Sequence, residues 1–376
     1  MKDRARHLYV HLPFCAHRCG YCDFVTVLNG RNGDHRHYVD ALLTELRLER
    51  PALAERLDSV FLGGGTPTLT SGTQLARLLD ELPPADEVTV EANPETITPA
   101  LARLLRSHGV NRVSLGAQTF RPHLLEVLER RAAPDVVRRA FYALRGANFD
   151  NTSLDLLYGI PGQSPADLDR DLTEALALAP EHLSWYELEA KAGTRFTHGH
   201  GAALARQAEA METYFERVVE VLTDAGYRWY ETANFCLERA RAGGRDLRAR
   251  HNLAYWRGSD YLGIGIGAVS TLGDVRRRNT PKLRTYLTSL EAGEPPPRDL
   301  EVLDAGVRER EQLMLGLRLD EPLMLETVAA SVEPQSAEKL ERLGLVRRSG
   351  RRGAEELRLT DRGRFLGDAV TTELLR

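Results

Sequence analysis

Short apolar runs alternate along most of the chain with segments whose apolar residues follow helical spacing. The apolar runs predict buried strands at residues 8–10, 59–62, 87–92, 111–116, 151–158, 182–188 and 227–232. The periodic segments predict helices at residues 36–53, 73–82, 99–107, 122–145, 165–179 and 204–225. Strands that alternate with helices are typical of βαβ units. The pattern therefore predicts an α/β fold whose parallel sheet forms a complete or partial barrel.

The pattern changes after the last of these strands. Residues 250–270 are too rich in glycine to predict a helix and too apolar to predict disorder. The Pro-rich linker at 293–297 predicts one domain at 1–297 and a second at 298–376. In the second domain we expect helices and a strand that resemble a winged-helix module, at residues 305–317, 336–343, 356–360 and 362–375.

A basic turn in the second domain has two interpretations. A winged helix that binds nucleic acid could use these residues as its wing, namely Arg347, Arg348, Arg351 and Arg352. They also fit the solvated tip of a hairpin. We favour the hairpin tip, because no second basic or aromatic stripe accompanies the arginines.

Three of the four cysteines lie in one stretch, HLPFCAHRCGYCDF, at residues 11–24. Cys15, Cys19 and Cys22 follow the first predicted strand on a segment that contains Pro and Gly, which favours a loop. Three thiolates on one loop indicate a metal site. A four-iron cluster usually takes four thiolates, so three would leave one iron open to a substrate or cofactor.

A zinc site is the alternative for the same loop. His11 or His17 would then supply the fourth ligand. Zinc ligand pairs are normally separated by about a dozen residues, whereas these cysteines are close together in the sequence. The spacing therefore favours the cluster.

Polar residues and glycines stand where four successive predicted strands end. They are Gly63–Gly65, then Glu91 with Asn93, then Gln118, and then Asp155. In barrels of this kind, ligands bind at the carboxyl ends of the strands. Any one of these residues could instead cap a helix. Four in succession favour a ligand site, because a carboxylate among apolar neighbours is costly to bury without a partner.

Composition and charge argue against several classes of function. The 376 residues are 42% hydrophobic and carry a formal net charge of −4, which does not favour bulk binding to nucleic acid. No run approaches the roughly 20 apolar residues of a membrane span, and the first residues lack the apolar core of a secretory signal. Three clustered cysteines and a distant Cys236 suit a reducing compartment. We therefore expect a cytoplasmic protein with no transmembrane segment.

The motifs together resemble those of a known superfamily. CxxxCxxC spacing followed by Gly-Gly after the next strand is similar to the radical S-adenosylmethionine (SAM) superfamily. The phrases LYVHLPFC, GGGTPT, EANPE, DLLYGIPGQ and HNLAYW resemble the coproporphyrinogen III dehydrogenase-like group, and within it the HemW-type haem chaperones. The likeness covers nearly the whole chain. It implies a partial (βα)6 TIM-like barrel of the radical SAM type with a Gly-rich extension, followed by a helical or winged-helix-like module.

The resemblance also implies which residues hold cofactors. Cys15, Cys19 and Cys22 would ligate a 4Fe–4S cluster whose fourth iron chelates SAM. Further residues are implied at the cofactors: Tyr9 and Phe24 against cluster and adenine, Gly64, Gly65 and Thr66 at the methionyl amino group, Glu91 at the ribose, and Gln118, Arg130 and Asp155 elsewhere around SAM. An arginine suits a carboxylate because its guanidinium can bond both oxygens.

Two stretches depart from the family pattern. Residues 128–132 read LERRA where many relatives read LGRxH, and residues 265–270 read GIGAVS where they read GPGAHS. Any role of the missing histidines is therefore in question, whereas the cluster ligands are unaffected.

Two functions in this group use similar scaffolds. The dehydrogenases carry an additional segment before the cluster loop and a cysteine two residues after its third ligand, where this chain has Phe24. HNLAYW, at residues 251–256, is typical of the chaperones. The resemblance thus implies a protein that binds haem and delivers it to a haem-requiring acceptor, such as a respiratory membrane enzyme. The alternatives are an oxygen-independent coproporphyrinogen III dehydrogenase and a winged-helix protein that binds nucleic acid.

His251 is the residue that we expect to contact haem iron. Neutral imidazole is a usual axial ligand, and Tyr255 and Trp256 offer a flat apolar surface for a porphyrin. In the alternative, His251 and Asn252 only hold their segment to the barrel through hydrogen bonds. Cys236 is a weaker candidate, because isolated cysteines are more often small buried apolar residues.

Overall fold

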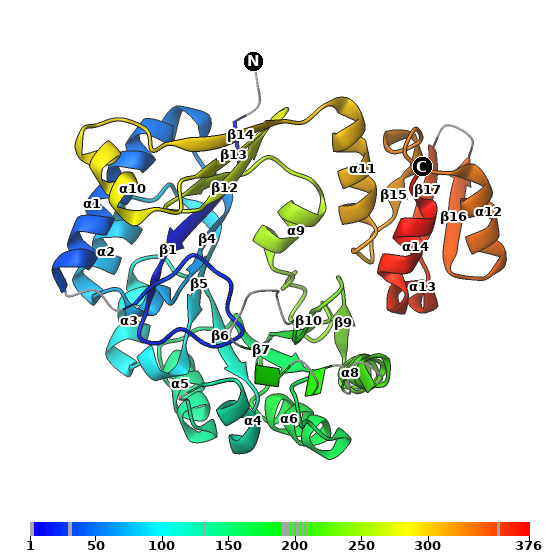
Figure 1. The fold of residues 1–376 in the computed structure, drawn as a ribbon. Helices are drawn as coiled ribbons and strands as arrows, with labels where there is room; N and C mark the ends of the chain where they lie inside the picture. Colours follow the sequence, from blue (N-terminus) through cyan, green and yellow to red (C-terminus); the bar gives the residue numbers. More distant parts are fainter. Residues whose placement is uncertain are drawn as a thin grey trace.

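The computed structural model of the chain describes residues 4–28, 32–130, 132–189, 196, 199–200, 203–204, 207, 210–351 and 354–376. Within this part, nine strands form one sheet in the order β11-β1-β4-β5-β6-β7-β8-β10-β9 (Figure 1). Its centre is parallel and consists of β1 (His7–Leu12), β4 (Leu57–Gly64), β5 (Ala85–Ala92), β6 (Arg112–Gln118), β7 (Thr152–Tyr158) and β8 (His182–Glu187). The strand β11 (Leu262–Ile264) pairs parallel to β1.

The two edges of this sheet do not join. At one edge, β9 (Tyr227–Trp229) and β10 (Asn234–Leu237) form an antiparallel hairpin beside β8. Among the described residues no pairing connects β9 with β11, so the predicted partial barrel is confirmed. The strand expected at 227–232 is present as β9, but it is shorter and does not pair with β8. Residues 230–233 connect it to β10, a connection so short that the two strands pair antiparallel, and β10 lies between β9 and β8.

Amphipathic helices cover the outer face of the sheet (Figure 1). They are α1 (Asn32–Glu49), α2 (Gly72–Glu81), α3 (Pro99–Ser107), α4 (Pro122–Val127), α5 (Pro134–Gly146), α6 (Pro165–Ala177) and α8 (Met211–Asp224). At the start of α6, Ser164 and Asp167 form a capping box, and Pro165 fits the first turn because its missing N–H would lack a partner there. Leu168 and Leu172, one turn apart, are buried in the main core.

The glycine-rich passage contains a helix, which the sequence analysis did not expect. The helix α9 (Arg250–Trp256) uses the residues that precede the glycines. Gly258, with a φ of 66°, follows directly after its end in the left-handed conformation that often terminates helices. The glycine content of the whole passage does not reveal the helix, because all its glycines come after the helix.

His251 fastens α9 to the interior of the barrel. Its Nδ1 lies 3.0 Å from the hydroxyl of Ser59 on β4, and its Nε2 lies 3.2 Å from the hydroxyl of Tyr255. The ring stacks on Phe61 with centroids 5.1 Å apart and is 2% exposed. Burial lowers the pKa of His251 to about 3. These contacts favour the alternative in which His251 holds α9 in place. Its role as a haem ligand stays a prediction, and it would require one of these bonds to break.

The end of the chain has an apolar core of its own. The helices are α11 (Ala305–Gly316), α12 (Pro334–Arg342), α13 (Asp361–Phe365) and α14 (Gly367–Leu374). A small sheet in the order β15-β17-β16 accompanies them, formed by β15 (Leu323–Met324), β16 (Val346–Arg351) and β17 (Ala354–Leu359). Leu313, Leu340, Leu357 and Val370 are buried together in this core. We call residues 305–376 the C-terminal module.

The domain boundary at residue 297 stays a prediction. A three-stranded sheet, β12 (Val269–Leu272), β13 (Val275–Asn279) and β14 (Arg298–Val302), lies beside the barrel with α10 (Leu283–Glu291). Because β14 pairs with β13, residues 298–302 are structurally continuous with the first part of the chain.

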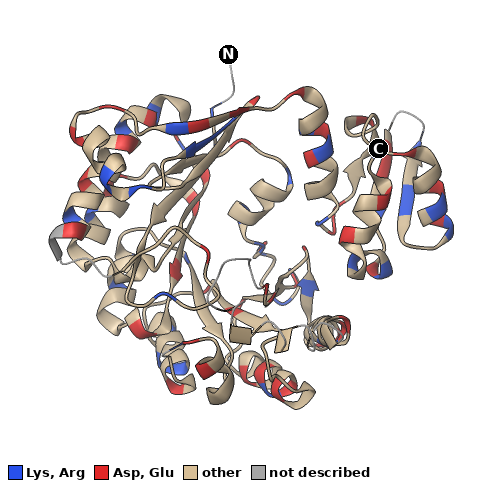
Figure 2. Cartoon of the chain, viewed as in Figure 1, with Lys and Arg blue, Asp and Glu red and all other residues tan. Residues whose placement is uncertain are grey.

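Acidic and basic residues are interspersed over the helices of both parts (Figure 2). In the basic turn, Arg348 Nη2 lies 2.6 Å from Glu341 Oε2, while Arg352 lies outside the described residues. In the described ranges, no helix is both long and apolar enough to cross a bilayer.

Replacing His251 with Ala should lower the free energy of unfolding at pH 7 by about 2–4 kcal/mol. The change removes the imidazole that contacts Tyr255 and one of the two that contact Ser59, which keeps His7 Nδ1 at 2.9 Å, and it opens a cavity beside Phe61. Urea denaturation measures the loss. Tyr255→Phe is the control, because it removes one hydroxyl and keeps the imidazole.

The stability of the wild-type protein and that of His251→Ala should depend differently on pH. A buried imidazole with a lowered pKa resists protonation, so its contribution is present above the unfolded pKa of 6.5 and is lost as the pH falls toward 3. At pH 5 the wild-type protein should have lost about 2 kcal/mol through this group, and His251→Ala should not. If the unfolding free energies of the wild type and His251→Ala differ by the same amount at pH 7 and at pH 5, the buried neutral state of His251 would be contradicted.

Candidate functional site

The cysteine loop leaves β1 and is held against the carboxyl end of the sheet. Its two ends pair with each other through β2 (Phe14–Cys15) and β3 (Val27–Leu28). The backbone N–H of Gly65 donates to Leu12 O at 2.9 Å, and that of Thr66 donates to Phe14 O at 2.8 Å. The loop therefore lies directly on the residues that end and follow β4.

Two glycines permit this close approach. Gly64 has a φ of 110°, and a Cβ there would lie 2.5 Å from the ring of His11. A Cβ at Gly65 would lie 2.6 Å from the backbone of Pro13. Only glycine combines this conformation with this proximity, so both positions are needed to seat the loop.

The three cysteines of the loop are free thiols near one another. Cys15 is buried, whereas Cys19 and Cys22 are half-buried, and Cys22 N donates to Cys19 O at 3.2 Å. The hydroxyl of Thr66 lies 3.9 Å from Cys15 Sγ, and Arg130 Nη1 lies 3.7 Å from Cys19 Sγ. Burial raises the pKa values of Cys15 and Cys22, so binding a metal there would require the release of protons.

The hydrogen bonds of the histidines argue against the zinc alternative. His11 Nδ1 lies 3.1 Å from the hydroxyl of Tyr9, and its Nε2 lies 2.8 Å from Val25 O. His17 lies 3.7 Å from a carboxylate oxygen of Glu129. Over the described residues, no three His, Cys, Asp or Glu side chains converge on a single ion. A cluster does not need such convergence, because each thiolate binds a different iron. Three partly buried thiols on one loop thus fit a cluster better than a single zinc ion.

Two acidic side chains lie on strands of the same sheet. Glu91 is near the end of β5 and Asp155 is in the middle of β7, with β6 between these strands. Glu91 Oε2 accepts a hydrogen bond from Gly64 N at 3.2 Å, and Asp155 accepts from the hydroxyl of Ser114 at 2.8 and 3.0 Å. Burial, and then the charge of Asp155, raise the pKa of Glu91 to about 7. The two carboxylates therefore lie close enough to interact.

A chain of polar contacts crosses from the end of β4 to the cysteine loop. Asn93 Nδ2 donates to the hydroxyl of Thr66 at 3.0 Å, and Asn93 Oδ1 accepts from Arg130 Nη2 at 2.9 Å. Arg130 also donates to Gly116 O at 3.0 Å and reaches Cys19. Its Nε is buried without a partner among the described residues, so the guanidinium retains an unused donor.

The other predicted site residues lie in different surroundings. Gln118 stands at a bulge that ends β6, with a φ of 65°, and its amide packs on Gly116. Tyr9 points into the barrel, where it stacks on Phe61 and His251. Phe24 is 61% exposed, and its role at the cofactors stays a prediction.

Tyr21 is a residue that the sequence analysis missed. Its hydroxyl interacts with Cys19, and its ring packs edge-on against Phe196 with centroids 6.3 Å apart. Burial raises its pKa. An aromatic residue between the second and third cysteines was the available signal.

The structure gives local explanations for Cys236 and Glu129. Cys236 is buried in β10 beside His182, which agrees with a small apolar residue, and burial raises its pKa to about 12. Glu129 adopts a φ of 54°, which explains why glycine suits that position in LGRxH. Arg131 lies outside the described residues.

Comparisons with known proteins agree with this geometry. A family model described as the radical SAM superfamily matches residues 9–175, which contain the cysteine loop and the polar strand ends. The heme chaperone HemW of Mycobacterium tuberculosis H37Rv is 37% identical, over 98% of this chain and 94% of its own length. HemW of Lactococcus lactis is 31% identical, over 100% and 98% of the two chains. HemW of Bacillus subtilis is 32% identical, over 96% and 97%.

A solved structure extends the likeness to the whole fold. Coproporphyrinogen III oxidase (HemN) from Escherichia coli, a radical SAM enzyme, superposes with a TM-score of 0.80. It covers 99% of this chain and 90% of its own at 22% identity, which shows a shared fold and no more. The curated relatives are more similar in sequence over almost their full length. This chain therefore belongs to the HemW family of the radical SAM superfamily.

Proposed function

We propose that this protein is a radical SAM-type haem chaperone, which binds haem and transfers it to haem-requiring proteins. The observation that carries the proposal is the 37% identity, over 98% of the chain, to a protein named heme chaperone HemW. That alignment includes the C-terminal module as well as the cysteine loop.

Membership of the radical SAM superfamily implies a 4Fe–4S cluster and SAM as cofactors. Cys15, Cys19 and Cys22 would hold the cluster, and the open iron would face SAM. When bound and reduced, this pair supplies the electron that cleaves SAM to methionine and a 5′-deoxyadenosyl radical. Arg130 lies against Cys19, where its positive charge would stabilise a bound cluster of thiolates and support a carboxylate of SAM.

The polar strand ends would bind the rest of SAM. The N–H groups of Gly65 and Thr66 donate within the protein, so a methionyl ammonium, which itself donates, would use carbonyl oxygens and the hydroxyl of Thr66. Glu91 would accept from the ribose hydroxyls. Gln118, which ends β6, and Asp155, in the middle of β7, would complete the polar wall.

The proposed ligands beyond SAM are haem and an acceptor protein that requires it. We expect the acceptor, such as a respiratory membrane enzyme, to receive haem directly from this chain. The cytoplasm is the expected compartment, because cluster thiols must stay reduced. Coproporphyrinogen III dehydrogenase activity is the second candidate, and the shared fold with HemN is the observation that favours it.

Anaerobic assays separate the two functions. Cluster-loaded protein should bind haem with a shifted Soret band and should restore a haem-free acceptor faster than an equal amount of free haem. With coproporphyrinogen III, SAM and dithionite it should form no protoporphyrinogen IX. Appreciable formation of that product, or failure to bind haem, would overturn the chaperone proposal.

Replacing Cys15, Cys19 and Cys22 together with Ala should abolish the iron–sulfur absorption of anaerobically reconstituted protein. The measurement is the visible spectrum together with bound iron and sulfide. Cys236→Ala is the matched control and should keep the full cluster content, because Cys236 is buried in β10 away from the loop. Zinc bound in equal amount to the protein, without sulfide, would show that the cluster assignment is wrong.

SAM affinity should rise as the pH increases from 6 to 8. Glu91 has a raised pKa of about 7, so its carboxylate changes from mostly neutral to mostly ionised over this range. If the ionised form accepts the ribose hydroxyls, binding should strengthen by about tenfold. Calorimetry with SAM measures this. Glu91→Gln should remove the pH dependence, and a Gln variant with the same slope would assign it to another group.

A further inference from the structure

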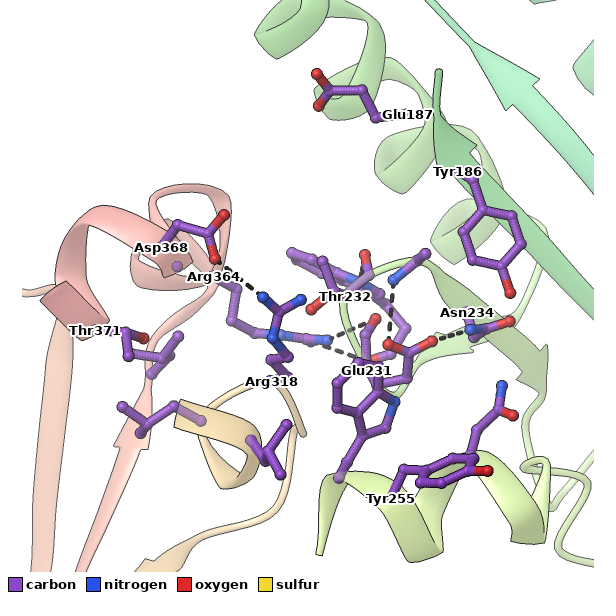
Figure 3. A pocket seen from close by; sticks show the side chains of 18 of the residues that line it. Tyr186, Glu187, Glu231, Thr232, Asn234, Tyr255, Arg318, Arg364, Asp368 and Thr371 are labelled. Atoms are coloured by element: carbon purple, nitrogen blue, oxygen red, sulfur yellow. Dashed lines mark hydrogen bonds and ion pairs between the residues drawn. The ribbon is translucent and has the colours of Figure 1, made fainter. Parts of the chain in front are cut away.

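A large cavity lies between the barrel and the C-terminal module, apart from the cysteine loop. Its volume is about 1220 Å³, above the range of roughly 300–1,000 Å³ that holds ligands of drug size. The barrel contributes α9 and the hairpin of β9 and β10, and the module contributes α11 and α13 (Figure 3). None of the cysteines or the predicted SAM residues lines it.

Its walls are unusually aromatic. All three tryptophans of the chain, Trp185, Trp229 and Trp256, line the cavity, together with Tyr255 and Phe365. Tyr255 and Trp256 belong to HNLAYW, and they are on the cavity side of α9, whereas His251 contacts the barrel. The indole N–H groups of Trp185 and Trp256 are buried without an acceptor in the described chain. Two hydrogen-bond donors of the cavity wall are therefore unsatisfied. Trp185 is fully buried and Trp229 is 6% exposed beneath Arg364, so Trp256 and Tyr255 offer the aromatic surface that a flat apolar ligand could reach.

Two arginines of the module provide positive charge at the cavity. Arg364 lies 3.5 Å from the ring centroid of Trp229 and donates to Trp229 O at 2.9 Å. Burial lowers the pKa of Arg364 to about 10, although the charges of Asp320, Asp361 and Glu231 act in the opposite direction. Arg318 lies 5.2 Å from the ring of Trp256 and pairs with Asp368 at 3.3 Å, but the side chain of Asp368 is 96% exposed. Such an exposed pair holds its arginine weakly.

Two of the other three arginines along this cavity are held more strongly. Arg276 bonds both oxygens of Glu311 at 2.7 Å, and Arg257 makes three contacts of 2.7–3.0 Å with Glu321. The third, Arg308, lies 3.8 Å from Asp260 Oδ1. Arg318 and Arg364 are the two that lie over tryptophan rings of the cavity, where they could meet the charged groups of a ligand that packs on this wall. Both point toward the region between the module and the barrel in Figure 3.

We propose that this cavity is the haem site, with the tetrapyrrole against Trp256 and Tyr255, and with its two propionates on Arg318 and Arg364. The inference rests on the proposed function and adds where haem binds. Haem is a flat apolar ring with two carboxylates, which matches an aromatic slot with two guanidinium groups. Because one wall belongs to the barrel and the other to the module, bound haem would bridge the two parts. Haem binding would not require the cluster cysteines.

The test compares haem with haem dimethyl ester, in which the propionates carry no charge. The full-length wild-type protein should bind haem at least about tenfold more tightly than the ester in titrations followed by the Soret band. Arg318→Ala and Arg364→Gln should each weaken haem by about tenfold and leave the ester unchanged. Arg342→Ala, on the exposed face of α12 in the same module, is the matched control and should behave like the wild type.

Arg318→Ala keeps the test decisive if Arg364→Gln unfolds the module. Within the described part of the chain its ion pair is with the exposed Asp368, so this variant should retain the wild-type unfolding midpoint. Wild-type protein that binds haem and its ester equally, or Arg318→Ala protein that binds haem as tightly as the wild type, would overturn the site while leaving the chaperone proposal intact. Wild-type protein that binds no haem would overturn both.

Discussion

The close contact between the cysteine loop and the end of β4 is the constraint on which the proposed cofactor site depends. Gly64 leaves room for the ring of His11 and Gly65 for the backbone of Pro13 and Phe14, where a Cβ would collide, and two backbone hydrogen bonds hold the segment there. The loop is therefore positioned by main-chain geometry before any metal is bound. Preorganisation of this kind reduces the conformational entropy that ligand binding would otherwise cost.

The polar strand ends face an electrostatic problem that a bound cofactor would relieve. Glu91 and Asp155 are neighbouring acids in a largely buried place, and the raised pKa of Glu91 shows that the free site disfavours two charges. On the other side of the site, Arg130 keeps an unpartnered Nε while its other nitrogens reach Cys19, Asn93 and Gly116. Acids on one side and a guanidinium on the other match a ligand with an ammonium group, hydroxyls and a carboxylate. The charges thus argue for SAM more specifically than the barrel does, since a barrel hosts many ligands.

Local patterns predicted the elements well where packing agrees with them. The boundaries of α3 and the order of strands β1 to β8 follow from Pro and cap residues and from short apolar runs. Strand pairing could not be predicted in the same way. The pattern at residues 227–229 predicts another barrel strand, but the short connection that follows makes the next strand antiparallel. The sequence analysis also misjudged α9, because composition ignores that the glycines follow the helix. Among the candidate site residues, Glu91 and Asp155 follow from polar positions within apolar strand runs, whereas Arg130, which comes after α4, follows only from the family resemblance. The direction of His251, and the exposure of Phe24, depend on contacts that no local pattern encodes.

The helix α9 joins the two sites that the structure separates. On one side His251 is bonded to Ser59 and stacked on Phe61, both in β4, the strand whose end seats the cysteine loop. On the other side Tyr255 and Trp256 form part of the cavity wall. Because His251 Nε2 contacts the hydroxyl of Tyr255, a ligand that displaced Tyr255 would disturb the contact that anchors the helix to β4. HNLAYW therefore combines an anchor and a ligand-facing surface on one short helix, and its histidine need not touch iron for the motif to serve haem binding.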